Sequence, residues 1–79
     1  MSKKVTVYSK PNCKFCVMTK NWLEGNGTEF KEVDVMQDTK AFEYVVNELG
    51  FQGLPVTEIE GHEPFGAFQP DLLDEYINQ

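Results

Sequence analysis

The sequence contains no arginine, and this absence limits the partners that we expect the protein to bind. Its seven cationic residues are all lysine, they stand against thirteen acidic residues, and the formal net charge over 79 residues is −6. Binding of nucleic acid relies on clustered cations and on the bidentate contacts that arginine makes with phosphate. We therefore expect no nucleic-acid partner.

Long apolar runs are also absent from the sequence. No run approaches the roughly 20 residues that a membrane-spanning helix needs. The charged start of the chain leads into a short alternating segment rather than into the apolar core of a signal peptide. We therefore expect a cytoplasmic protein without membrane contact. The length leaves room for one domain with a modest core, which we expect to span residues 1–79 and to be monomeric.

Cysteine is scarce as well. The chain has two cysteines, Cys13 and Cys16, with two residues between them. Secreted domains that are too small to bury a sufficient core rely on several disulfides, and a single ring this tight would stabilise little. The sequence therefore does not fit a secreted disulfide scaffold.

The spacing of apolar residues predicts strands and helices that alternate along the chain. Strands are expected at residues 3–8, 30–35 and 55–59 and near 64–65, and helices at 13–24, at 38–49 and from 70 onward. Asp38 and Gly50 are suited to begin and end a helix, and Pro70 suits a first helical position. The order β-α-β-α-β-β-α predicts an α/β protein with a four-stranded mixed sheet flanked by three helices.

Apolar residues at helical spacing supply the candidate core. In the first helix, Phe15, Met18 and Trp22 recur at i, i+3 and i+7. In the second helix, a similar stripe runs from Phe42 to Leu49. We expect burial, rather than a binding surface, for Trp22, Phe42, Val45 and Leu49.

The Cys13-Lys14-Phe15-Cys16 segment lies where a predicted strand passes into a predicted helix. Free backbone N–H groups and the positive end of the helix dipole stabilise a thiolate at Cys13, and Lys10 and Lys14 add positive potential. Cys16 is one turn further along and should be more covered. We therefore expect Cys13 to attack disulfides and Cys16 to release the product, with Phe15 as an apolar contact for partners.

Two other interpretations of the cysteine pair remain open. A structural zinc site needs four ligands, and His62 is the remaining imidazole, so a closed site would require dimerisation. A carrier that holds a metal ion or a cluster through Cys13 and Cys16 would likewise bind it across a dimer. Otherwise, His62 is expected to be a solvated residue of a polar turn. The cysteines could also be inert core residues, but the strand–loop–helix setting favours redox chemistry.

Pro55 opens the third predicted strand. A cis peptide bond at this position would leave backbone groups of Leu54 and Val56 free to pair with an extended substrate or with glutathione. Spacing alone favours an ordinary trans bond, because only about 5–6% of bonds before proline are cis.

Together these motifs resemble a glutaredoxin of the NrdH-redoxin type, over essentially the whole chain. The motifs are Val7-Tyr8-Ser9-Lys10-Pro11-Asn12-Cys13-Lys14-Phe15-Cys16, Leu54-Pro55-Val56 and Gly66-Ala67-Phe68-Gln69-Pro70-Asp71. The resemblance implies a thioredoxin fold, a cis bond before Pro55, and reduction of protein disulfides through a redox-active Cys13–Cys16 disulfide without a bound cofactor. It also implies the following partner-binding residues: Lys10, Lys14, Phe15, Leu54, Pro55, Val56, Gly66, Ala67 and Phe68.

The motifs depart from typical glutaredoxins in ways that bear on the reductant. Lys14 replaces a proline, and the glycine pair that approaches glutathione is reduced to Gly66-Ala67, with the following acid displaced to Asp71. The resemblance to NrdH redoxins implies recharging by thioredoxin reductase and electron delivery to class Ib ribonucleotide reductase. Lys10 and Pro55 are retained, so glutathione stays open as the alternative reductant and co-substrate.

The lysines are placed unevenly. Residues 1–20 carry five lysines and no acid, and Lys10, Lys14 and Lys20 lie in the segment that presents Cys13. We expect a local cationic patch that favours the thiolate and steers an oppositely charged partner. Whether Lys20 reaches the active site or stays at the surface is open.

Overall fold

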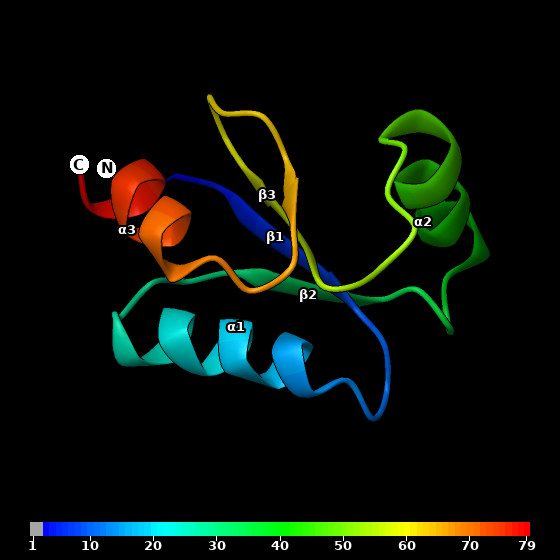
Figure 1. The fold of residues 1–79 in the computed structure, drawn as a ribbon, viewed down its shortest axis with the longest axis horizontal. Helices are drawn as coiled ribbons and strands as arrows, with labels where there is room; N and C mark the ends of the chain where they lie inside the picture. Colours follow the sequence, from blue (N-terminus) through cyan, green and yellow to red (C-terminus); the bar gives the residue numbers. More distant parts are fainter. Residues whose placement is uncertain (1–2) are drawn as a thin grey trace.

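The computed structural model describes residues 3–79 and contains the predicted order of elements (Figure 1). The strands are β1 (Val5–Ser9), β2 (Lys31–Asp34), β3 (Val56–Ile59) and β4 (Phe65–Gly66). The helices are α1 (Lys14–Gly25), α2 (Thr39–Glu43), its π-helical continuation η1 (Tyr44–Glu48), and α3 (Pro70–Asn78). The observed bounds differ from the predicted ones by one or two residues. Met1 and Ser2, which begin the expected domain, lie outside the described residues.

The four strands form one mixed sheet in the order β2-β1-β3-β4. β1 pairs parallel to β2 and antiparallel to β3, and β3 pairs antiparallel to β4. This arrangement confirms the predicted mixed sheet. It follows from the connections, since α1 returns the chain for a parallel pairing, whereas a short turn joins β3 to β4. Among the described residues, no helix has the length and apolar character to cross a bilayer.

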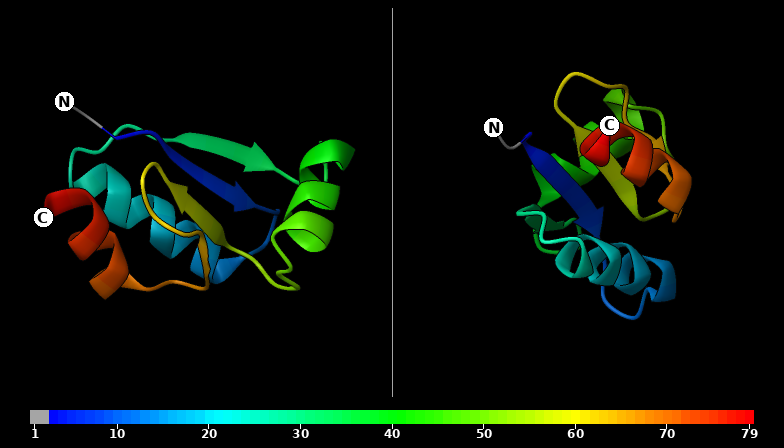
Figure 2. Two further views of the ribbon diagram at one scale, coloured as in Figure 1. Left: turned by 90° about the horizontal axis from the view of Figure 1, so that it is seen from above. Right: turned by 90° about the vertical axis from the view of Figure 1, so that its left-hand side faces the viewer.

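Helices cover both faces of the sheet, so the protein has two apolar cores (Figure 2). On one face, Val5 and Val7 of β1 pack with buried residues of α1 and α3, which are Leu23 and Leu73. On the other face, Tyr8 packs with Val45 of η1. Successive side chains of a strand point to opposite faces, which explains why neighbours in β1 join different cores.

The buried face of α1 is not the stripe of Phe15, Met18 and Trp22. Cys16 and Thr19 are buried with Leu23 further along the helix, whereas Phe15 is 54% exposed and Met18 is 36% exposed. Trp22 is half-buried and packs against the core. The buried stripe is offset by one residue and contains a polar threonine, which hid it from a search for apolar periodicity.

The second helix begins as predicted but changes geometry midway. The Asp38 side chain accepts a hydrogen bond from the Ala41 N–H at 3.1 Å, which confirms Asp38 as the cap. From Tyr44 the helix widens to π geometry, and the Leu49 N–H bonds to the Tyr44 carbonyl at 2.9 Å. Extra residues per turn rotate the apolar stripe relative to an α-helix.

Because of this rotation, the predicted core residues of the second helix differ in how deeply they are buried. Val45 is buried and Leu49 is half-buried, as expected. The predicted burial of Phe42 is wrong, since its side chain is 42% exposed. Ala41 and Tyr44, rather than Phe42, pack against the core on this side of the sheet. Phe42 instead lies on the rim of a surface groove.

Candidate active site

Cys13 caps the N-terminus of α1. The loop from β1 turns through Asn12, which has a positive φ of 59°, a conformation that asparagine tolerates. The Cys13 backbone is extended, with φ −109° and ψ 107°, and its sulfur accepts a hydrogen bond from the Cys16 N–H at 3.2 Å. A sulfur in this position faces free N–H groups and the positive end of the helix dipole. The predicted placement of Cys13 is confirmed.

Cys13 and Cys16 form a disulfide across the first turn of α1, with their Cα atoms 5.2 Å apart. The two side chains differ in exposure, which is 9% for Cys13 and 1% for Cys16. The outer sulfur is therefore the one that a substrate disulfide can approach. The roles expected from the sequence, with Cys13 attacking and Cys16 resolving, stay predictions.

The loop before β3 lies against the cysteines. The peptide bond between Leu54 and Pro55 is cis, as the resemblance implied and as spacing alone did not. The Leu54 carbonyl oxygen is 3.8 Å from Cys13 Sγ, and the Pro55 carbonyl accepts a hydrogen bond from the Ala67 N–H at 2.9 Å. The structure thus brings Leu54, Pro55 and Ala67 to the site. The Val56 side chain is fully buried within β3, so the predicted partner contact of Val56 concerns its backbone and stays a prediction.

The segment after β4 is tightly constrained. A Cβ added at Gly66 would lie 3.3 Å from a ring carbon of Phe51, so a larger residue would require Phe51 to move. Ala67 has a positive φ of 67°, a conformation that favours glycine. Phe68 is half-buried and packs against the core on the α1 and α3 side. Of these three residues, Ala67 is the exposed one.

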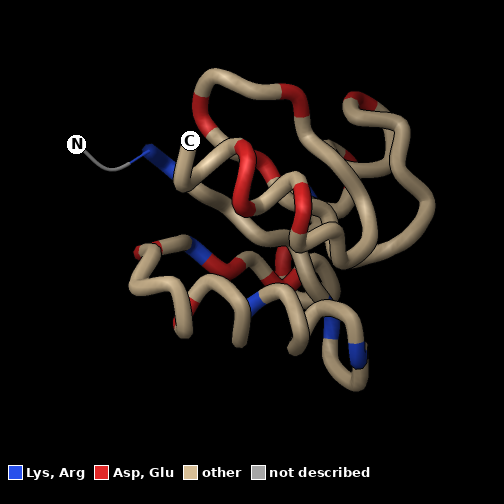
Figure 3. Tube along the Cα trace, turned by 60° about the vertical axis from the view of Figure 1, so that its left-hand side comes forward, with Lys and Arg blue, Asp and Glu red and all other residues tan. Residues whose placement is uncertain are grey.

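The cationic patch is smaller than the sequence predicted. Lys10 and Lys14 are exposed in the loop and first turn that present Cys13. Figure 3 shows the lysine positions along the backbone in blue. Lys20 forms an ion pair with Glu32 of β2, with Nζ and Oε2 2.6 Å apart. Its positive charge is therefore paired with a carboxylate. Lys3 and Lys4 precede β1 and lie at the opposite end of that strand. The free cations near Cys13 are therefore Lys10 and Lys14.

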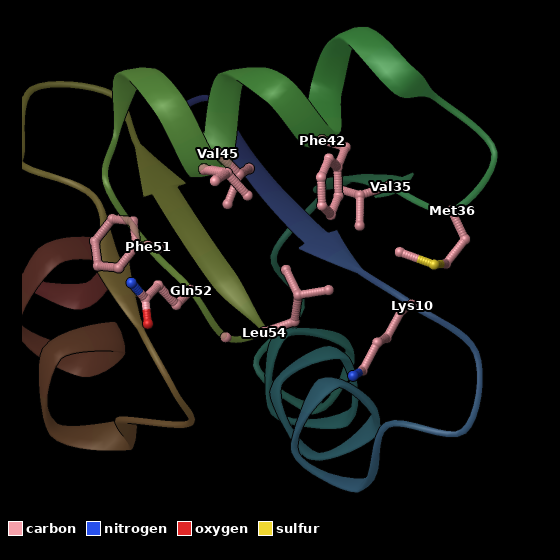
Figure 4. Close-up of a pocket in the computed structure, with 10 residues that line it drawn as sticks. Lys10, Val35, Met36, Phe42, Val45, Phe51, Gln52 and Leu54 are labelled. Carbon is pink, nitrogen blue, oxygen red and sulfur yellow. The ribbon is translucent and has the colours of Figure 1, made fainter.

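A groove opens beside Lys10 (Figure 4). Its volume is about 110 Å³, and Leu54 forms part of its wall, which links it to the cysteine site. Apart from Lys10, Gln52 and Gly53, the lining is apolar and consists of Val35, Met36, Phe42, Val45, Val46, Phe51 and Leu54. The groove combines one cation with an apolar wall next to the reactive disulfide.

His62 is placed away from the cysteines. It lies in the turn after β3, at the opposite end of that strand from Pro55, and its ring stacks on Tyr76 with centroids 4.0 Å apart. Within residues 3–79, no group of three or more His, Cys, Asp or Glu side chains lies close enough together to hold a metal ion. His62 is exposed, as the sequence predicted.

Two polar clusters near the site were not predicted. Glu32 accepts hydrogen bonds from Lys20 and from the buried Ser9 hydroxyl, the latter at 3.1 Å. The hydrogen bond from Lys20 lowers the pKa of Glu32 from its usual value. The alternation of Val5, Val7 and Ser9 could have placed Ser9 on the α1 face, but no sequence signal pairs Lys20 with Glu32.

The second cluster joins three elements on the α2 side of the sheet. Glu58 of β3 accepts hydrogen bonds from the hydroxyls of Tyr8 on β1 and Tyr44 on η1. The hydrogen bond to Glu58 raises the pKa of Tyr44 to about 12. Burial, together with the Glu58 charge, raises the pKa of Tyr8 above its usual value. Because Tyr8 and Glu58 lie on different strands far apart in sequence, only the fold reveals this contact.

Known proteins share this arrangement. A model of the glutaredoxin family matches residues 5–63 of the chain. The Gene 56 protein of Mycobacterium phage L5 is 40% identical over 74 residues, covering 94% of this chain and 72% of that protein. The glutaredoxin-like protein NrdH of Lactococcus lactis subsp. cremoris is 38% identical over 69 residues, covering 87% of this chain and 93% of that protein.

Solved structures agree with these sequence matches. NrdH-redoxin from Escherichia coli superimposes with a TM-score of 0.83 at 29% identity, covering 91% of this chain and 92% of that chain. The thioredoxin-like protein BC3987 gives a TM-score of 0.85 at 29% identity, covering 92% of this chain and 99% of that chain. The chain therefore belongs to the glutaredoxin family, as an NrdH-like member with the thioredoxin fold, and is a thiol–disulfide oxidoreductase that carries the Cys13–Cys16 pair.

Proposed function

We propose that the protein is a cytoplasmic dithiol electron carrier that thioredoxin reductase recharges and that reduces class Ib ribonucleotide reductase. The Cys13 thiolate attacks the target disulfide and forms a mixed disulfide, releasing one target thiolate. Cys16 then attacks Cys13, so the Cys13–Cys16 bond forms and the second target sulfur leaves. Two electrons pass to the target, and the reductase returns them. A cytoplasmic location suits a carrier that must be kept reduced between cycles.

The choice of thioredoxin reductase over glutathione rests on the pair Gly66 and Ala67. Glutaredoxins that use glutathione present a glycine pair here, followed by an acid. In this chain, Ala67 places an exposed Cβ at the second position, with φ at 67°. The next acid is Asp71, in the first turn of α3. Both changes remove features that hold glutathione.

The groove beside Lys10 supports the same choice. Its mostly apolar wall suits a protein side chain better than the peptide and carboxylate groups of glutathione. The Escherichia coli NrdH-redoxin is described as having a thioredoxin-like activity profile. Glutathione is the second candidate reductant, because Lys10 is exposed beside the site and the cis bond before Pro55 is retained.

A comparison of two reducing systems tests the reductant. The oxidised protein is mixed either with thioredoxin reductase and NADPH or with glutathione, glutathione reductase and NADPH, and NADPH consumption is followed. We expect reduction by thioredoxin reductase to be at least about tenfold faster. Cys13→Ser gives the background rate in both systems. Equal or faster reduction by glutathione would overturn this assignment and favour the glutathione alternative.

A second assay tests the target. The reduced protein should sustain turnover of a class Ib ribonucleotide reductase, and the Cys13→Ser variant should not. If the wild-type protein accepts electrons from thioredoxin reductase yet fails to support this turnover, the target is another disulfide protein. The two assays therefore separate the reductant from the target.

A further inference from the structure

The Thr57 hydroxyl is unusual among the buried groups of this protein. The side chain is fully buried, with 0% exposure, and its oxygen is the one buried side-chain N or O within residues 3–79 that has no hydrogen-bond partner. Buried polar groups in folded proteins are nearly always hydrogen-bonded, because an unpartnered hydroxyl has lost its water without compensation. The missing partner therefore needs an explanation.

The other buried hydroxyls are already satisfied. The Ser9 hydroxyl donates to Glu32 at 3.1 Å, and the Thr19 hydroxyl donates to the Phe15 carbonyl at 3.0 Å. Both residues are buried, with 2% exposure for Ser9 and 0% for Thr19. Thr57 is therefore the one of the three whose hydroxyl is still available to a new partner.

Thr57 faces the layer that contains α1. It lies on β3 in register with Val7 of β1 on one side and with Phe65 of β4 on the other. Side chains in register point to the same face of a sheet. Val7 and Phe65 belong to the core that includes Leu23 of α1, so the Thr57 side chain points into that core.

Thr57 lies in the half of β3 that follows the contact with the start of α1. The Leu54 carbonyl is 3.8 Å from Cys13 Sγ, so the loop that leads into β3 lies against the residue that caps α1. From that contact, β3 and α1 both run away from the active site. The buried residue of α1 that follows Cys13 is Cys16, and Thr57 follows Leu54 by three residues. Thr57 and the resolving cysteine therefore face the same layer, and each lies three residues beyond the contact between Leu54 and Cys13.

We propose that the Thr57 hydroxyl becomes a hydrogen-bond partner of Cys16 Sγ when the disulfide is reduced, and is thus a third catalytic residue. In the disulfide, Cys16 Sγ is held toward Cys13. Reduction releases that sulfur, which can then rotate toward the sheet. It also gives the sulfur a proton or a negative charge, and either makes it a better hydrogen-bonding group than a disulfide sulfur.

The hydroxyl acts in the resolving step. Cys16 attacks the Cys13 sulfur of the mixed disulfide, the Cys13–Cys16 bond forms, and the bond from Cys13 to the target breaks. The Cys16 proton ends on the released target thiol, so atoms and electrons balance. A hydrogen bond from Thr57 lowers the cost of holding the Cys16 thiolate, which is 1% exposed, away from water. The proposal rests on thiol–disulfide exchange and not on any particular reductase or target.

The test is the equilibrium between dithiol and disulfide forms in a glutathione redox buffer, which needs no reductase. Thr57→Val keeps the shape and removes the hydroxyl, so it deprives the dithiol form of a hydrogen bond and relieves the disulfide form of an unpartnered group. We expect about a tenfold shift toward the disulfide, which equals about 30 mV for this two-electron couple. Resolution of a Cys13–glutathione mixed disulfide should slow by about tenfold.

Matched variants separate this role from packing. Thr19→Val removes an equally buried hydroxyl that already has a partner, and Thr57→Ser keeps the hydroxyl, so both should stay within about twofold of wild type. If Thr57→Val fails to fold, Thr57→Ser and Thr57→Ala give the same comparison. An unchanged equilibrium for the variants without the hydroxyl overturns the proposal, as does an equal shift for Thr19→Val. If a buried water bonds to the Thr57 hydroxyl in both the dithiol and the disulfide form, the redox equilibrium will be unchanged, and the proposal is overturned.

Discussion

At the scale of single residues, the chemistry depends on two cysteines that lie in different surroundings. Cys13 Sγ accepts a hydrogen bond from the Cys16 N–H at the start of α1. Cys16 lies on the inner side of the helix and is 1% exposed. A thiolate at Cys13 is therefore stabilised by the helix terminus and can meet a substrate, whereas Cys16 can reach only the sulfur beside it.

The first prediction follows from this difference. Cys16→Ser should form a mixed disulfide with a small disulfide substrate and remain trapped, because Cys13 attacks but nothing releases the product. Cys13→Ser should form almost no adduct, because the remaining Cys16 is covered. Intact mass measurement after incubation with the substrate detects the adduct. Comparable adduct formation by Cys13→Ser would show that Cys16 is an independent nucleophile.

Ala67 carries the second residue-scale prediction. Its φ of 67° suits glycine, and an alanine there is strained, whereas glycine also loses more backbone entropy on folding. We expect Ala67→Gly to raise the free energy of unfolding by about 0.5 kcal/mol, the difference between these two effects. Urea denaturation measures it. Ala41→Gly, within α2, should instead lower stability by about 1 kcal/mol. A loss of stability in both variants would contradict this account of Ala67.

At the scale of elements, α1 shows what apolar spacing determines. Its approximate limits followed from the strand before it, the cysteine turn and Gly25 with the residues after it. Its buried face did not, because two stripes with helical spacing run side by side. Thr19 belongs to the buried stripe, where its hydroxyl is satisfied by the Phe15 carbonyl. The aromatic side chain of Phe15 is left at the surface next to the site.

The site was predictable to the extent that its residues are local in sequence. The cysteine turn and the loop at Pro55 are short motifs, so their residues could be named before the fold was known. The ion pair of Lys20 with Glu32 joins α1 to β2, and such a contact depends on how elements pack rather than on any local pattern. The change to π geometry at Tyr44 likewise has no signal in the spacing of apolar residues.

The contact of η1 with β3 supports the third prediction. A tyrosine whose pKa is raised on folding stabilises the protein below its unfolded pKa, and this contribution is lost as pH rises through the folded pKa. For Tyr44 the relevant window lies between 10 and about 12. The stability difference between wild type and Tyr44→Phe should therefore be present at neutral pH and shrink across that window. Urea unfolding at several pH values measures the difference.

A second variant identifies the cause. Glu58→Gln keeps an oxygen that can accept from Tyr44 but removes the negative charge that opposes tyrosine ionisation. Tyrosinate absorbance should then appear at lower pH than in wild type, because both Tyr8 and Tyr44 contact Glu58. A pH-independent stability difference for Tyr44→Phe, or an unchanged titration for Glu58→Gln, would show that this contact does not control tyrosine ionisation.

At the scale of the whole molecule, the net charge of −6 does not describe the active site. The acidic residues lie on β2, β3 and each of the helices and in the segments between them, whereas Lys10 and Lys14 lie in the loop and first turn that present Cys13. Figure 3 shows how the two kinds of charge are distributed along the backbone. Lys3 and Lys4, at the far end of β1, add to the total without reaching the cysteines. An acidic protein therefore presents a cationic edge beside its cysteine pair, and exposed charges of this kind act on encounter rates and are screened by salt.

The last prediction tests whether this edge activates Cys13. In the reduced protein, Lys10→Gln with Lys14→Gln should slow iodoacetamide alkylation of Cys13 at neutral pH by about threefold at low salt, because two exposed charges are lost near the thiolate. Added salt should narrow the gap between variant and wild type. Lys4→Gln is the matched control, since it removes an exposed lysine at the far end of β1. An equal effect of Lys4→Gln would attribute the change to net charge. If the double variant is alkylated as fast as wild type, the two lysines do not activate Cys13, and the N-terminus of α1 is the source of its reactivity.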